Sequence, residues 1–144
     1  FDFDRAALIN SEKLLVRGIE SSIEASPRPW LSGGGSWSFG DAESEALGQD
    51  PLDFFPAHRL SAWLRLGFER AGATARLQYT GPQIAKNTEL DSRLLLQLSA
   101  YARIGGNLLF TLRGENLSGT RYEQRLGVRA PGRVIFASLQ SEWK

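Results

Sequence analysis

Two carboxylates near the amino terminus raise the question of catalysis. Glu20 and Glu24 occupy equivalent positions of an alternating segment, where paired carboxylates would suit acid and base chemistry. The many arginines favour counter-charges as the interpretation of both. His58 is the single histidine and cysteine is absent, so the sequence predicts no metal site. No catalytic constellation stands out, and we expect a protein that is not an enzyme and carries no cofactor.

The run Ser-Gly-Gly-Gly-Ser at 32–36 has the composition of a phosphate cradle. Neither the Gly-Lys-Ser/Thr sequence of a P-loop nor the start of a helix follows it. We therefore interpret these small residues as part of a strand that a neighbouring side chain approaches closely.

The elements that position these residues alternate apolar and polar side chains with a period of two, which predicts β-strands. About eight strands are expected, at 1–9, 18–25, 31–39, 59–69, 73–80, 93–103, 108–115 and 134–143. A helix competes at 94–102, where leucines also fit a period of 3.6 residues. Strands at hairpin spacing on both sides favour a strand there, so the chain is predicted to be all-β.

The connections between these strands alternate in length. Those at 26–30, 70–72 and 104–107 are tight, with glycine or proline, whereas the polar segments at 40–58, 81–92 and 115–132 are long. An antiparallel up-and-down barrel places alternate connections at opposite rims. Short connections at one rim and long connections at the other are typical of a transmembrane β-barrel, which has short periplasmic turns and long external loops.

Alternation by itself also suits a soluble barrel, whose apolar side chains face inward. The membrane interpretation is favoured by aromatic residues near the ends of the runs, as interfacial girdles require: Trp30, Phe39, Tyr79 and Trp143. It is also favoured by polar rows that carry arginine rather than lysine, since the chain has fourteen Arg and three Lys.

The charged side chains of the polar rows are expected to face the lumen. This network comprises Glu20, Glu24, Arg59, Arg65, Glu69, Arg76, Arg93, Arg103, Arg113 and Glu115. The favoured interpretation is that the arginines pair with these glutamates within the wall. The other is an anion-attracting conduit for an acidic ligand. The formal net charge of +1 argues against a general nucleic-acid binder.

Several motifs occur in a characteristic order: Arg17-Gly18-Ile19-Glu20, Glu115-Asn116-Leu117, Tyr122, Pro131-Gly132-Arg133, and a last strand ending near Trp143. In this order the chain resembles the C-terminal end of a TonB-dependent outer-membrane receptor. The resemblance implies that residues 1–144 form the C-terminal part of a 22-stranded barrel, with no plug domain in this chain. The segment 111–133 would then contain the last external loop.

The resemblance also implies a function, which is energised uptake of a scarce nutrient such as a ferric siderophore or cobalamin across the bacterial outer membrane. The implied partners are outer-membrane lipid, the rest of the barrel and its plug, and the energy-coupling protein TonB. A self-contained eight-stranded structural or adhesive barrel and a soluble β-barrel carrier remain alternatives.

Ligand contacts are expected on the long loops, because specificity concentrates on loops held by a rigid scaffold. The candidates are Phe54, Phe55, His58 and Tyr122. For the two phenylalanines, packing within the loop is the competing interpretation.

Overall fold

The computed structural model describes residues 14–44, 55–85, 88–105, 107–125 and 127–141. The strands in these ranges are β1 (Leu14–Arg28), β2 (Leu31–Ser44), β3 (His58–Gly67), β4 (Ala71–Thr80), β5 (Gln83–Ala85), β6 (Thr88–Leu90), β7 (Arg93–Ile104), β8 (Leu108–Glu115), β9 (Glu123–Arg125), β10 (Val128–Arg129) and β11 (Val134–Ser141). Among the described residues, no helix is long and apolar enough to cross a membrane.

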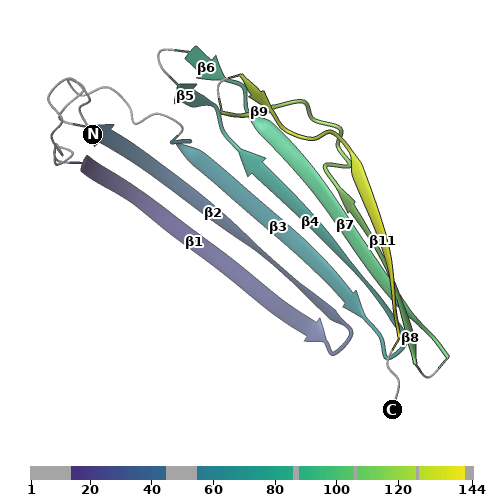
Figure 1. Ribbon diagram of the computed structural model, residues 1–144. Coiled ribbons are helices and arrows are strands. Elements are labelled where there is room, and N and C mark those ends of the chain that lie inside the picture. The colour runs from purple at the N-terminus through teal and green to yellow at the C-terminus, as the bar shows by residue number, and fades with distance from the viewer. Residues whose placement is uncertain (1–13, 45–54, 86–87, 106, 126, 142–144) are drawn as a thin grey trace, which may run out of the picture.

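The long strands form one antiparallel meander in the order β1-β2-β3-β4-β7-β8-β11. Figure 1 shows them side by side, with β5, β6 and β9 gathered at the end opposite to the β1–β2 turn. The all-β prediction is confirmed, and residues 94–102 belong to β7 rather than to a helix. The sheet is not closed, and the strand predicted at 1–9 lies outside the described residues.

The strand register keeps the alternating rows on separate faces. Leu64 of β3 pairs with Gly33 and with Ala75, whereas its neighbour Arg65 pairs with Ser32 and with Thr74. Because a shift of one residue would move every side chain to the other face, these pairs confirm the alternation read from the sequence. We call the face of Leu64 the apolar face and the face of Arg65 the polar face.

Neither face is buried by the residues that the structure describes. Ala42 is the one hydrophobic residue among the described residues that is buried, and Ile19, Ile23 and Leu139 are 63%, 75% and 64% exposed. An apolar surface of this extent is not left in water by soluble proteins, so the apolar face requires a cover.

Two of the predicted long connections contain short hairpins that the sequence analysis did not anticipate. Strands β5 and β6 pair within the segment 81–92, and β9 and β10 pair within 115–132. The second hairpin turns at Gly127, whose φ of 79° suits glycine. Both pairs are only two or three residues long, and periodicity cannot reveal strands of that length.

Candidate functional site

The polar face holds the charged network predicted from the sequence. Its members lie on β1 (Glu20, Glu24), β3 (Arg59, Arg65), β4 (Arg76), β7 (Arg93, Arg103) and β8 (Arg113, Glu115), with Glu69 in the β3–β4 turn. The cross-strand partners on this face are mostly small and polar, as for Arg59, which lies between Ser38 and Thr80. The arginines are therefore accessible above a floor of serine and threonine.

The expected pairing within the wall occurs at one place among the described residues, where Arg113 forms a salt bridge with Glu115. Glu20 lies opposite Ser38, and Arg59 lies on the other side of that serine. Glu20 and Arg59 are thus two strands apart, which separates their Cα atoms by roughly 10 Å at the spacing of a β-sheet. Glutamates at the β1 edge leave the centre of the polar face basic.

A hollow of about 410 Å³ lies on the polar face next to the long connections. Arg59 and Arg93 flank it, both paired with Thr80 from opposite sides. Ser36 and Ser61, which share a hydrogen bond of 2.8 Å, also line it. We call this hollow the loop-rim hollow.

Each arginine of the loop-rim hollow is held by an aromatic ring from a long connection. The guanidinium of Arg93 lies 5.0 Å from the centre of the Tyr122 ring and donates a hydrogen bond of 2.9 Å to Gln83 Oε1. The guanidinium of Arg59 lies 5.8 Å from the Phe55 ring. Two predicted loop candidates, Phe55 and Tyr122, are thereby joined to two predicted arginines by cation–π contacts.

The remaining loop candidates lie elsewhere. His58 is the first residue of β3 and lies on the apolar face opposite Phe39, with its ring 5.0 Å from Phe39 and stacked 6.2 Å from Trp37. It joins an aromatic cluster and does not share the polar face with Arg59. Phe54 lies outside the described residues. Among the described residues, no group of three or more His, Asp or Glu side chains is placed to hold a metal ion.

The connection after β8 begins with a compact hydrogen-bonded anchor around Asn116. This residue is buried and has a φ of 49°, a conformation that Asn adopts more readily than most residues. Its Nδ2 donates to the carbonyl oxygens of Thr120 (2.9 Å) and Pro131 (3.1 Å), and its Oδ1 accepts from the Thr120 amide (3.1 Å) and the Ser118 hydroxyl (3.2 Å). The start and the end of this connection are thus tied to one side chain.

The same anchor bonds to β7 where β8 has ended. Leu117 N donates to Leu96 O (2.8 Å), and the hydroxyls of Ser118 and Thr120 donate to Leu94 O (2.8 and 2.6 Å). Residues 117–120 therefore take the place of a strand along the end of β7. Asn116 and Pro131-Gly132-Arg133 stand out in the sequence as motifs. Ser118 and Thr120 do not, because their only signal is their position just after the asparagine.

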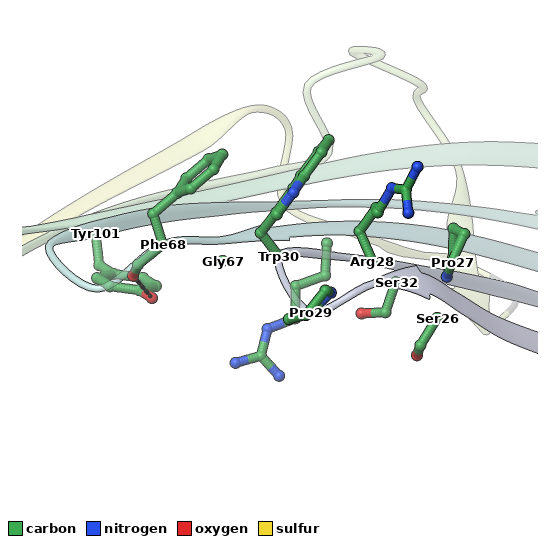
Figure 2. A pocket seen from close by; sticks show the side chains of 10 residues that line it. Ser26, Pro27, Arg28, Pro29, Trp30, Ser32, Gly67, Phe68 and Tyr101 are labelled. Atoms are coloured by element: carbon green, nitrogen blue, oxygen red, sulfur yellow. Dashed lines mark hydrogen bonds between the residues drawn. The ribbon is translucent and has the colours of Figure 1, made fainter.

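A second hollow, of about 560 Å³, lies at the opposite rim, where the turns are short. Figure 2 shows Trp30, Phe68 and Arg28 projecting to one side of the sheet and Tyr101 to the other. The Trp30 and Phe68 rings are stacked with their centres 5.7 Å apart, and Tyr101 Oη donates to Phe68 O (3.3 Å). The Tyr101 ring occupies the space that a side chain at Gly72 would need, which is why a glycine is required there.

Comparison with solved structures identifies the fold. The chain superimposes on the ferric enterobactin receptor PfeA of Pseudomonas aeruginosa with a TM-score of 0.77 and 19% identity, over 92% of this chain and 23% of that one. The ferric-catecholate import receptor Fiu of E. coli K12 gives 0.71 and 18%, over 88% of this chain and 20% of that one. The copper transporter OprC gives 0.75 and 14%, over 90% and 24%.

No protein-family model and no curated relative matches the sequence. The chain spans about a quarter or less of the length of each of the three receptors that it resembles. These three are TonB-dependent outer-membrane receptors, and the chain has the fold of a segment of their barrel. In such a barrel the apolar face contacts lipid and the polar face lines the lumen.

Proposed function

We propose that this chain is part of a TonB-dependent receptor of the bacterial outer membrane, which takes up a scarce solute with energy supplied from the inner membrane. A transporter of this kind carries out no catalysis. The observation that supports the proposal is the superposition of one continuous sheet, 92% of this chain, on a segment of a ferric enterobactin receptor.

The exposed apolar face supports the outer-membrane location. Leu64 and Leu98 are 50% and 44% exposed on β3 and β7, which have arginines on the other face, and Ile135 of β11 is 68% exposed. Lipid is the cover that such a face needs, because hydrocarbon contacts remove its apolar surface from water.

The loop-rim hollow supports an anionic solute, such as a ferric siderophore, over a neutral one. Arg59 and Arg93 have no carboxylate partner among the described residues, and their aromatic contacts leave the guanidinium edges able to donate hydrogen bonds. An anionic chelate passing the rim would meet two fixed cations and the hydroxyls of Ser38, Ser61 and Thr80.

The test is a measurement of solute uptake by cells that produce the receptor with a tag on this chain. We expect iron-labelled catecholate siderophore to accumulate, and a protonophore to abolish the accumulation. The variant pair Arg59→Ala and Arg93→Ala should together reduce the initial rate at least fivefold. The matched control, Arg28→Ala, removes an arginine at the short turns and should leave the rate unchanged.

Two results would count against the proposal. Accumulation that survives the protonophore would exclude energised transport, and absence of the tagged chain from the outer-membrane fraction would exclude the location. If uptake is energised but the double variant matches the wild type, the receptor stands and the anionic solute is excluded.

A further inference from the structure

The apolar face is hollowed at one place. A hollow of about 370 Å³ lies over the parts of β4 and β7 that are nearer to the short turns. Ala73, Ala75 and Ala100 belong to its lining. Ala71 and Ala102 pair with each other in the next row and extend the run of alanines toward the short turns. We call these five residues the alanine trough.

Larger side chains on the two neighbouring strands form the walls of the alanine trough. Leu64 and Leu66 of β3 pair with alanines of β4, and Phe110 and Leu112 of β8 pair with alanines of β7. The side chain of alanine is a single methyl group, so the floor lies below the isobutyl and phenyl groups on both sides. A hydrocarbon chain in the trough therefore touches more atoms than it would on a flat wall, and each contact adds dispersion attraction.

The trough ends halfway along the strands. Leu98 lies opposite Ala75, and Leu77 lies opposite Leu96, so large side chains fill the floor from these rows onward. From Ala71 to Ala75 the trough is roughly 13 Å long at the rise of a strand. The hydrocarbon depth of one leaflet is similar, roughly 15 Å. A polypeptide that crossed the membrane beside the wall would need a groove that continued to the other rim, whereas a lipid of one leaflet ends midway.

The rim at the open end of the trough is basic. Among the described residues, the short turns carry three arginines, Arg28, Arg70 and Arg103, against one glutamate, Glu69, and none of the four forms an ion pair with another described residue. Arg70 is exposed and directly precedes Ala71 in the β3–β4 turn. Its carbonyl oxygen accepts a hydrogen bond from Arg103 N (2.7 Å), which ties this turn to the end of β7. A basic rim of this kind is complementary to the phosphate groups of anionic lipids.

Aromatic rings place the same rim at the level of the lipid headgroups. Trp30 and Phe68 are stacked and project to one side of the sheet (Figure 2), and Phe68 continues the alternation of Leu66 on the apolar face. Tryptophan is enriched where the membrane meets water. Phe68 N donates to Ala71 O (2.8 Å), so the residue that carries this ring lies beside the mouth of the trough.

We propose that the alanine trough, with Arg70 at its mouth, binds one anionic glycerophospholipid of the periplasmic leaflet and retains it in preference to the bulk lipid. An acyl chain lies over the alanines between the walls on β3 and β8. The guanidinium of Arg70 donates charge-assisted hydrogen bonds to the phosphate oxygens. The inference rests on the proposed function, because the apolar face meets lipid only in a wall that spans the outer membrane.

Native mass spectrometry tests the trough in the receptor isolated from outer membranes through a tag on this chain. The probe is phosphatidylglycerol, added back to the delipidated receptor in detergent micelles. The double variant Ala73→Leu with Ala100→Leu raises the floor to the height of the walls and should retain one phosphatidylglycerol molecule fewer than the wild type.

The matched control for the trough is Ala137→Leu. Ala137 is exposed on the same face and pairs with Leu112, on the side away from the trough. It adds a leucine without filling the hollow, so the number of retained lipids should not change. Recovery of both variants from the outer membrane shows that each barrel has assembled.

Competition between phosphatidylglycerol and zwitterionic phosphatidylcholine with the same acyl chains tests the headgroup contact. At the site that the double leucine variant lacks, the wild type should prefer phosphatidylglycerol at least fivefold. Arg70→Gln should remove this preference, and Arg28→Gln should keep it. Arg28 projects to the same side as Phe68 (Figure 2), but its cross-strand row reaches the trough only at β4, three strands away.

Four results would overturn the inference. They are equal lipid retention by the wild type and the double leucine variant, an equal loss in Ala137→Leu, equal binding of the two lipids, and equal responses to Arg28→Gln and Arg70→Gln. A second polypeptide that the double leucine variant loses in place of lipid would also overturn it, by assigning the trough to a protein. Energised uptake by a receptor that lacks the lipid site refutes this inference alone. Lipid retention by a receptor whose uptake survives the protonophore refutes energised transport alone.

Discussion

The two ends of the sheet are ordered by different kinds of interaction. The short-turn rim carries the β1–β2, β3–β4 and β7–β8 turns, and the loop rim carries the connections 81–92 and 115–132. At the short-turn rim, the β3–β4 turn closes on a backbone hydrogen bond from Phe68 N to Ala71 O (2.8 Å). Side chains add the stacked rings of Trp30 and Phe68 and one hydrogen bond from Tyr101 Oη to Phe68 O. At the loop rim, side chains carry the order through the Asn116 anchor and the contacts of Arg93. A short turn needs only its backbone, whereas a long connection needs polar side chains that reach across many residues.

This difference predicts that single substitutions have larger effects at the loop rim. Asn116→Ala should give the largest effect, a loss of roughly 3–5 kcal/mol from the free energy of unfolding. Four hydrogen bonds worth about 1 kcal/mol each disappear, and alanine is strained at positive φ by about 1 kcal/mol. The urea midpoint of the receptor in detergent, followed by its tryptophan fluorescence, measures this loss.

The control for the Asn116 anchor is Asn116→Gly, which accepts the positive φ but makes none of the side-chain bonds. It should recover about 1 kcal/mol relative to Asn116→Ala, the cost of the backbone strain. A loss below 1 kcal/mol in both variants would contradict the role of the anchor and remove the contrast between the rims.

Arg93→Ala should have an intermediate effect that is confined to the loops. The substitution removes the bond to Gln83 and the contact with the Tyr122 ring, worth about 1–2 kcal/mol together. Because Gln83 and Tyr122 belong to different connections, both should open. Limited proteolysis should cut within 81–92 and 119–133 several times faster than in the wild type.

The matched control for Arg93 is Arg103→Ala on the same strand and face at the short-turn rim. Arg103 is exposed and has no side-chain partner among the described residues, so the cleavage rate of the loops should not change. Equal acceleration in both variants would mean that the arginines of β7 act through general charge rather than through local contacts.

The same contrast explains which features were predictable from the sequence. Alternation placed Leu64 and Arg65 on opposite faces correctly, because strand register and side-chain parity are linked. It could not show that Asn116 bonds to Pro131, fifteen residues away, because that contact depends on the path of the connection. Parity likewise does not decide which charges pair: it assigns Glu20 and Arg59 to one face, but the distance between them depends on the strands that carry them.

His58 illustrates a further limit. Its position after a long polar segment made it a loop candidate, yet as the first residue of β3 it follows the parity of Leu60 and lies on the apolar face against Phe39. The run of alternation that begins at Arg59 extends one residue further than the sequence analysis assumed. The ends of strands are the least certain part of such a pattern, since the alternation has no neighbour beyond them.

Trp30→Ala should give the smallest effect, because the turn that carries Trp30 keeps its backbone bonds in the variant. The Trp30 and Phe68 rings are 42% and 54% exposed, and a stacked pair contributes about 0.5–1.5 kcal/mol beyond its buried area. A double-mutant cycle with Phe68→Ala isolates that coupling from the loss of each ring alone. A coupling in this range, well below the loss in Asn116→Ala, supports a rim held by its backbone. A coupling as large as the Asn116 loss would show instead that the stacked rings hold the short-turn rim as firmly as the anchor holds the loops.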